Sequence, residues 1–222
     1  MANDWFTKSS WNEADQADFF AHFKRSRGAS NKAQYLRVQA DRLERTGSPE
    51  LLQAAIVLLD KMLAEFPEVT QLALACCQKA NCLAKLGDRD QALAYYRHAL
   101  DAERKFPFSR TQTLHDFGIF VVENKMTQFY DEALAVLEEM KLPGSEFPSD
   151  VYKGYGIRAL IAAHKGEIEK AKEFAGIALG AARKEHSGLR YHPTFGLVQN
   201  RESGFYQAIE TIVTSHVQSF AN

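Results

Sequence analysis

The stretch from Ala75 to Arg104 reads ACCQKANCLAKLGDRDQALAYYRHALDAER, and it decides the fold. Apolar residues recur at helical spacing on both sides of the dipeptide Gly87-Asp88. Glycine adopts the left-handed backbone conformation that ends a helix, and an aspartate side chain can cap the helix that follows. The stretch therefore predicts two antiparallel helices, over residues 72–86 and 89–104, joined by a tight turn.

The two predicted helices carry small residues where they would touch. Ala80 lies in the first helix, and Ala92 and Ala99 lie in the second. Small side chains let two helix backbones approach closely, and large side chains fill the space between them. The larger apolar residues of the stretch are Leu83, Leu86, Leu93, Tyr96 and Leu100.

This hairpin resembles the tetratricopeptide repeat (TPR). That family has a small residue in helix A, a glycine seven residues later, and then Ala-x3-aromatic-x2-Ala in helix B. Ala80, Gly87, Ala92, Tyr96 and Ala99 match these positions at the family's spacing. The resemblance implies an all-α fold of about ten to eleven helices, in which antiparallel helical hairpins stack into a right-handed superhelix that binds other molecules.

The pattern recurs four times between residues 31 and 184. The small residue and the glycine of the four hairpins are Ala40 and Gly47, Ala80 and Gly87, Val121 and Gln128, and Ala159 and Gly166. The third pair departs from the pattern. The matching helix-B alanines are Ala55, Ala92, Ala133 and Ala171, and their spacings of 37, 41 and 38 residues exceed the family's repeat of about 34. We therefore expect an irregular superhelix.

Two further expectations concern the third hairpin and the segment after it. Ser109 can cap a helix from about Arg110 to Lys125, and its mate begins near Tyr130. Residues 142–149 are rich in proline and glycine and are expected to form a loop before the fourth hairpin.

Capping helices are expected at both ends of the array. Ser10-Trp11-Asn12-Glu13 has the form of a capping box and opens a helix to about Arg25. The aromatic residues around it are typical of a helix that covers the exposed face of a terminal repeat, with a partner-binding aromatic patch as the alternative. The predicted organisation is an N-terminal cap in residues 1–30, four hairpins in residues 31–184, and a loop with a C-terminal capping helix in residues 185–222.

Composition places the chain in a broad class. Its 222 residues are 45% hydrophobic and 25% charged, as in soluble globular proteins. The N-terminal sequence lacks the pattern of a secretory signal, and nowhere do 18 apolar residues run together. Cys76, Cys77 and Cys82 are odd in number and lack CxxC spacing, which argues against a disulfide framework or a zinc site. We expect a reduced, cytoplasmic protein without a membrane partner.

No motif for catalysis or for a cofactor is present. The phosphate-binding, dinucleotide-binding, zinc-protease and nucleophile-elbow patterns are all missing. His186 and His192 are six residues apart in a loop, but no acidic or cysteine ligand accompanies them at useful spacing. Cys77 would be a nucleophile only in a basic microenvironment. The sequence therefore predicts a non-enzymatic protein with no cofactor and no metal.

The resemblance also suggests where a partner would bind. In TPR proteins the A helices line a concave groove, and their ligands contact recurring positions on it. Mapping those positions by helix phase gives the predicted partner-binding residues Gln34, Arg37, Asp41, Arg45, Asn81, Lys85, His115 and Lys153. The basic members predict a protein or peptide partner with an acidic segment. The structural alternative is that Arg37 and Asp41, four residues apart, pair along their own helix.

One TPR subfamily grips the C-terminal carboxylate of a peptide with lysine and asparagine side chains. Asn81 matches an asparagine of that clamp, whereas Cys77 stands where its lysine would be and Asp41 replaces another asparagine. The clamp is incomplete, so binding of chaperone tails is not expected. An adaptor, a secretion chaperone or a toxin-neutralising inhibitor fits the pattern better.

Nucleic-acid binding is the alternative function. Residues 24–45 form a basic strip with seven Lys and Arg residues against two acidic ones. The net charge of −1, and the lack of a code-like pattern of side chains from repeat to repeat, count against a helical repeat that reads RNA.

The three cysteines give a first test. We expect every thiol to be free, because the count is odd and the residues are closely spaced on one helix. Alkylation of untreated protein under denaturing conditions, followed by mass measurement, should add one label to each of the three cysteines. A single label would reveal a disulfide and contradict the cytoplasmic assignment.

Overall fold

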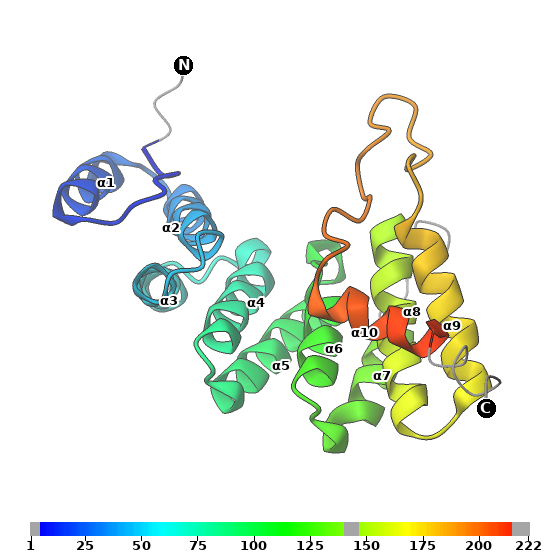
Figure 1. Cartoon of the computed structure of the whole chain (residues 1–222). Coiled ribbons are helices and arrows are strands. Elements are labelled where there is room, and N and C mark those ends of the chain that lie inside the picture. The colour runs from blue at the N-terminus through cyan, green and yellow to red at the C-terminus, as the bar shows by residue number, and fades with distance from the viewer. Residues whose placement is uncertain (1–4, 140–146, 215–222) are drawn as a thin grey trace. The chain divides into compact units, whose positions relative to one another are not determined.

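The computed structural model describes residues 5–139 and 147–214 of the chain (Figure 1). In that part of the chain all regular structure is helical, with ten α-helices, two short 3-10 helices and no strand. The all-α prediction is confirmed. The chain divides into two compact units, residues 1–113 and residues 114–222. The predicted boundaries at residues 30 and 184 stay a prediction.

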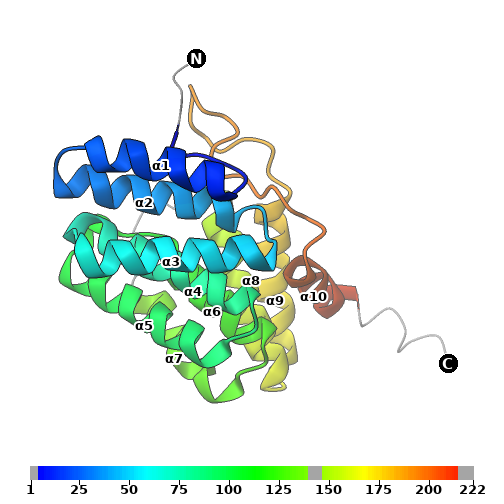
Figure 2. The same ribbon diagram turned by 90° about the vertical axis from the view of Figure 1, so that its left-hand side faces the viewer.

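The first unit consists of a leading helix and two hairpins. Its elements are α1 (Glu13–Arg25), α2 (Ala29–Glu44), α3 (Pro49–Glu65), α4 (Val69–Lys85), α5 (Arg89–Lys105) and the 3-10 helix η1 (Pro107–Ser109). Helix α2 packs against α3, and α4 packs against α5. Contacts between α3 and α4 and between α2 and α4 join the two hairpins. The first helices of the two hairpins are therefore neighbours, and α1 lies along the outer side of α2 (Figure 2).

The turns of these hairpins form where the sequence predicts them. Gly47 and Gly87 have positive φ angles of 75° and 85°, which a residue with a side chain rarely adopts. The carboxylate of Asp88 accepts a hydrogen bond from the backbone N of Gln91 at 3.1 Å, so it caps α5. Ser48 caps α3 with Pro49 in the first turn.

The second unit contains the remaining helices. They are α6 (Thr113–Glu123), the 3-10 helix η2 (Thr127–Phe129), α7 (Tyr130–Glu139), α8 (Pro148–His164), α9 (Ile168–Ala182) and α10 (Gly204–Thr214). Helices α8 and α9 form the hairpin that the fourth repeat predicts, with Gly166 at a φ of 76° in the turn. Helix α10 packs on both α8 and α9, in the position expected of a terminal cap.

Two predicted helix starts are wrong. Helix α1 begins at Glu13, because the side chain of Asn12 accepts from the backbone N of Asp15 at 2.9 Å and so takes the capping role assigned to Ser10. Helix α6 begins at Thr113, and Ser109 ends η1 instead of capping a helix.

The shift of α6 has a local cause. The buried carboxylate of Glu103 accepts a hydrogen bond from the backbone N of Thr111 at 3.1 Å, and the Oγ1 of Thr111 accepts from the backbone N of Thr113 at 3.1 Å. These bonds hold the chain extended before the helix. Of the predicted loop, residues 142–146 lie outside the described residues, and Pro148 and Ser149 already belong to α8.

The close packing of α10 on α8 depends on a glycine in α8, Gly156. A Cβ atom on Gly156 would lie 2.5 Å from the Cδ1 of Ile209 and 2.8 Å from the Cζ of Phe205. Both of these α10 side chains are buried, so neither has room to move away. Gly156 therefore allows α10 to lie directly on the backbone of α8.

Gly156→Ala should accordingly disturb the contact between α8 and α10. Overpacking of this kind costs about 1–3 kcal/mol, partly offset by the higher helix propensity of alanine, about 1 kcal/mol. Gly176→Ala in α9 is the matched control, because a Cβ there meets nothing within 4 Å. Urea unfolding should show Gly156→Ala to be less stable than Gly176→Ala by about 1–3 kcal/mol. Equal stabilities would mean that α10 does not lie on Gly156.

Candidate functional site

Three polar side-chain pairs connect the neighbouring helices α2 and α4. The Nε of Arg37 donates to the Oε1 of Gln71 at 2.6 Å. The Nε2 of Gln78 donates to the Oδ1 of Asp41 at 3.2 Å. The Nζ of Lys85 lies 2.9 Å from the Oε1 of Glu44. We call these six residues the α2–α4 ladder.

Asp41 also pairs with a cation, Arg45, which is the C-cap residue of its own helix. The Nε and Nη2 of Arg45 donate to its carboxylate at 2.8 and 3.3 Å. The alternative considered from the sequence was a pair of Arg37 with Asp41, and the residue that makes the ion pair with Asp41 is Arg45. An acidic residue four positions before a basic one is the more favourable orientation on a helix, and Arg37 reaches across to α4 instead.

Arg37 is half-buried in this arrangement. Burial lowers the pKa of its guanidinium, although the nearby charge of Asp41 acts in the opposite direction. Arg45 is different, because its hydrogen bond to Asp41 raises its pKa and about 70% of its side chain is exposed. Arg37 is therefore partly covered within the ladder, whereas Arg45, beside the ladder, is open to solvent.

Gln78 is the most deeply covered member of the ladder. It is 7% exposed, and its Oε1 is a buried acceptor without a hydrogen-bond partner among the described residues. An unpaired buried amide oxygen destabilises a fold by about 1–3 kcal/mol. The hydrogen bond from its Nε2 to Asp41 offsets this cost.

Asn81 and Gln34 complete the predicted residues of the first unit. The Oδ1 of Asn81 accepts from the hydroxyl of Tyr96 at 2.6 Å, so this side chain links α4 to α5 within its own hairpin. Gln34 is exposed on α2. The structure thus gathers Gln34, Arg37, Asp41, Arg45, Asn81 and Lys85 on α2 and α4 of one unit.

The other two predicted residues lie together in the second unit. His115 is on α6 and Lys153 is on α8, where the Nζ of Lys153 lies 3.9 Å from the carboxylate of Asp116. Arg158, which the groove mapping missed, lies beside them. Its Nη1 donates to the backbone O of Gly154 at 3.1 Å.

Gly154 lies next to the side chains of both Arg158 and His115. A Cβ at this position would be 3.3 Å from the Nη1 of Arg158 and 3.7 Å from the Nε2 of His115. Burial lowers the pKa of His115 to about 3, and the charges of Lys153 and Arg158 act in the same direction. The imidazole is therefore neutral at physiological pH.

The basic strip at residues 24–45 is divided among several contacts. Lys32 lies over the rings of Phe23 and Phe66, at 5.4 and 5.6 Å from their centroids. Arg37 and Arg45 belong to the contacts of α2 described above. Three of the seven basic residues of the strip are thus engaged in contacts, and the other four, Lys24, Arg25, Arg27 and Arg42, are exposed.

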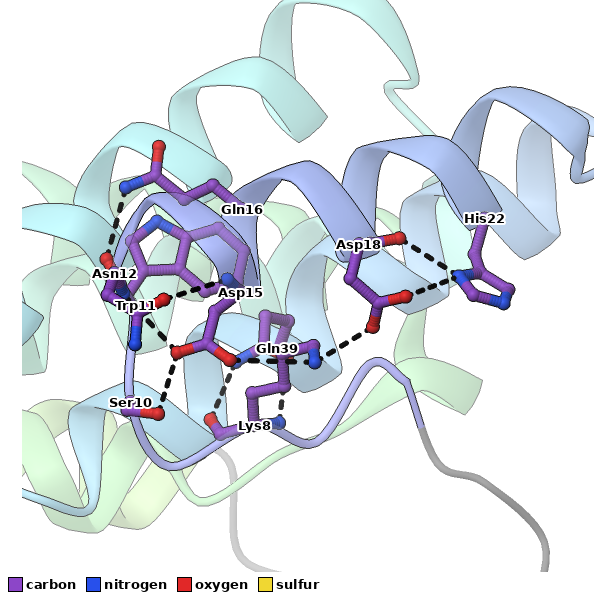
Figure 3. Close-up of polar contacts among 9 residues, drawn as sticks. All are labelled: Lys8, Ser10, Trp11, Asn12, Asp15, Gln16, Asp18, His22 and Gln39. Atoms are coloured by element: carbon purple, nitrogen blue, oxygen red, sulfur yellow. Dashed lines mark hydrogen bonds and ion pairs between the residues drawn. The ribbon is translucent and has the colours of Figure 1, made fainter.

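The segment before α1 is held against α1 and α2 by hydrogen bonds (Figure 3). The backbone N of Lys8 donates to the Oε1 of Gln39 at 2.9 Å, and the Nε2 of Gln39 donates back to the O of Lys8 at 2.8 Å. The Nζ of Lys8 lies 2.8 Å from the carboxylate of Asp18 and 3.6 Å from that of Asp15.

Aromatic packing reinforces this attachment. The ring of Trp5 lies 5.2 Å from that of Phe19 on α1 and 4.8 Å from that of Tyr35 on α2, measured between centroids. Trp11 contacts Phe19 at 5.3 Å. The aromatic residues of the N-terminus therefore serve as a cap on α1 and α2.

The remaining candidates are the cysteines, possible metal ligands and membrane-spanning helices in the described part of the chain. Cys76, Cys77 and Cys82 are buried and carry free thiols. Burial raises the pKa of Cys76 to about 11 and that of Cys82 to about 12, so neither forms a thiolate at neutral pH. Among residues 5–139 and 147–214, no three His, Cys, Asp or Glu side chains are placed to hold a metal ion. No helix in these residues is long and apolar enough to cross a membrane.

Comparison with models of known protein families, with curated proteins and with solved structures finds no match for this chain in any of the three.

The environment of His115 predicts a pH dependence of stability. Its pKa is about 3 in the folded chain and about 6.5 when unfolded, so the unfolded state binds the proton first as the pH falls. The stability that the neutral imidazole contributes is present above pH 6.5 and is lost on acidification toward pH 3. Between pH 7 and pH 5 the loss should be about 2 kcal/mol.

His115→Gln should remove this part of the acid sensitivity. Denaturant unfolding of parent and variant at pH 7 and pH 5 gives the difference directly. If both proteins lost the same stability between the two pH values, the described burial of His115 would be wrong.

Proposed function

We propose that this chain is a non-enzymatic protein-interaction module of TPR-like hairpins, which binds a protein or peptide on the face formed by α2 and α4. The observation that carries the proposal is that the first helices of two successive hairpins lie side by side and carry the α2–α4 ladder. A stack of hairpins produces such a face, because each hairpin contributes the same helix to the same side.

The burial of the family's small residues supports the repeat assignment. Ala40, Ala80 and Ala159 are each at most 1% exposed, and so are the helix-B alanines Ala55, Ala92, Ala133 and Ala171. The glycine seven residues after each of the first three ends its helix with a positive φ. The burial of the small side chains and the positions of the turns thus support the proposed repeats.

The chemistry of the face supports a polar partner. The charged residues of the face have a net charge of +1. They are Arg37, Arg45 and Lys85 against Asp41 and Glu44. The side chains of Arg45 and Lys85 are 70% and 46% exposed, whereas Gln78 is buried. The exposed cations would raise the association rate of a partner with an acidic segment. The roles that we propose for such a module are those of an adaptor, a secretion chaperone or a toxin-neutralising inhibitor.

The experiment begins with identification of the partner by affinity capture from the native source and mass spectrometry. The purified partner is then titrated against variants of the full chain. The first variant is a double substitution, Gln34→Glu with Arg45→Glu. It adds negative charge to the face at two exposed positions. We expect the double variant to bind at least tenfold more weakly, because it reverses the charge that attracts an acidic segment.

The control double variant is Gln53→Glu with Arg89→Glu. It makes the same change in charge at exposed positions on α3 and α5, the second helices of the two hairpins. Both double variants should melt close to the parent, because exposed ion pairs contribute only about 0–1 kcal/mol. Equal affinities of the two double variants for the partner would place the interface elsewhere.

A further inference from the structure

The segment between α9 and α10 is an ordered loop that extends beyond the ends of α8 and α9 (Figure 1). Within residues 186–200, the backbone N of Ser187 donates to the O of Pro193 at 2.7 Å. The Oγ of Ser187 donates to the O of His192 at 2.9 Å and accepts from the backbone N of Leu189 at 3.2 Å. One serine therefore closes the loop on itself.

The second half of the loop, which leads back toward α10, is attached to the start of α8 by a hydrogen bond. Gly196 has a φ of 72°, and its backbone O accepts from the N of Ser149 at 2.8 Å. A Cβ on Gly196 would lie 2.6 Å from the side chain of Phe147, so only glycine permits this approach. The rings of Phe147 and Phe195 meet edge to face at 5.2 Å between centroids.

The closed loop presents three exposed side chains at its far end, which we call the loop tip: Leu189, Arg190 and Tyr191. Leu189 is 41% exposed and Tyr191 is 79% exposed. The guanidinium of Arg190 lies 5.4 Å from the centroid of the Tyr191 ring. An apolar side chain and a large aromatic ring are thus held out toward solvent by a backbone that is already folded.

We propose that the loop tip is a docking element for a second protein, one that offers an apolar pocket bordered by acidic side chains. Tyrosine and arginine are the residue types that most often dominate the free energy of a protein interface. Because the loop is preorganised by its own hydrogen bonds, binding would not have to order it. Leu189 beside Tyr191 suits an apolar pocket of a protein better than a nucleic-acid backbone.

The charge of the loop itself favours an acidic partner surface. Arg190 is the one formally charged residue in residues 186–200, and it belongs to the loop tip. A cation at this position favours an acidic surface. The proposal does not depend on the α2–α4 face, since every residue that carries it belongs to the second unit.

Site-specific photo-crosslinking of the full chain in its native cells tests the proposal. The probe is p-benzoylphenylalanine in place of Tyr191, and the control carries it in place of Phe108, a fully exposed aromatic residue of the first unit. We expect a discrete protein adduct from position 191 that is absent from position 108. The adduct should disappear when Arg190→Glu is added to the same chain.

Titration of the crosslinked protein, once purified, completes the test. We expect Tyr191→Ala and Arg190→Glu each to weaken binding at least tenfold, with Phe108→Ala at the parental affinity. Gln34→Glu with Arg45→Glu separates this proposal from the proposed function, because it should leave an interface at the loop tip unchanged. The inference is overturned if no adduct forms, if the adduct is a second copy of this chain, if nuclease removes it, or if Tyr191→Ala binds like the parent.

Discussion

The close approach of the two helices within the hairpins α2–α3, α4–α5 and α8–α9 is the constraint on which the rest of the structure depends. It requires alanine at the contact, and Ala80 and Ala92 are both completely buried there. A larger side chain would force the helices apart, because protein interiors leave no spare volume. Once the hairpins are closed in this way, the first helices of neighbouring hairpins come side by side, and the α2–α4 ladder is a consequence of that placement.

One buried cation in the first unit contacts the helix before it and the helix after it. Lys79 on α4 is almost fully buried, yet it donates to the carboxylate of Asp60 on α3 and to the hydroxyl of Tyr95 on α5 at 2.8 Å. Burial acts to lower its pKa, but these hydrogen bonds outweigh it and raise the pKa. A buried ammonium tolerates few alternative positions, because it is strongly destabilising without its partners. We therefore propose that Lys79 and the ladder help to set the register of the two hairpins.

Local chemistry is what the sequence predicts well. The positive φ of Gly87 and the cap at Asp88 follow from residues that act within one turn, and the structure confirms both. The ladder partners Gln71 and Gln78 were not predicted, because pairing across α2 and α4 depends on the register of two helices that are far apart in sequence. Their spacing of seven residues, which places them on one stripe of α4, was the available signal. The late start of α6 escaped prediction for a similar reason, since it depends on the carboxylate of Glu103.

The central claim is that a protein partner covers the side of the first unit on which α2 and α4 lie next to each other. Hydrogen–deuterium exchange of the full chain, measured by mass spectrometry with and without the purified partner, tests it most directly. The account predicts slower exchange on binding in peptides from α2 and α4, with peptides from α3 and α5 changed less. Unchanged exchange in α2 and α4, with slowing confined to other segments, would contradict it.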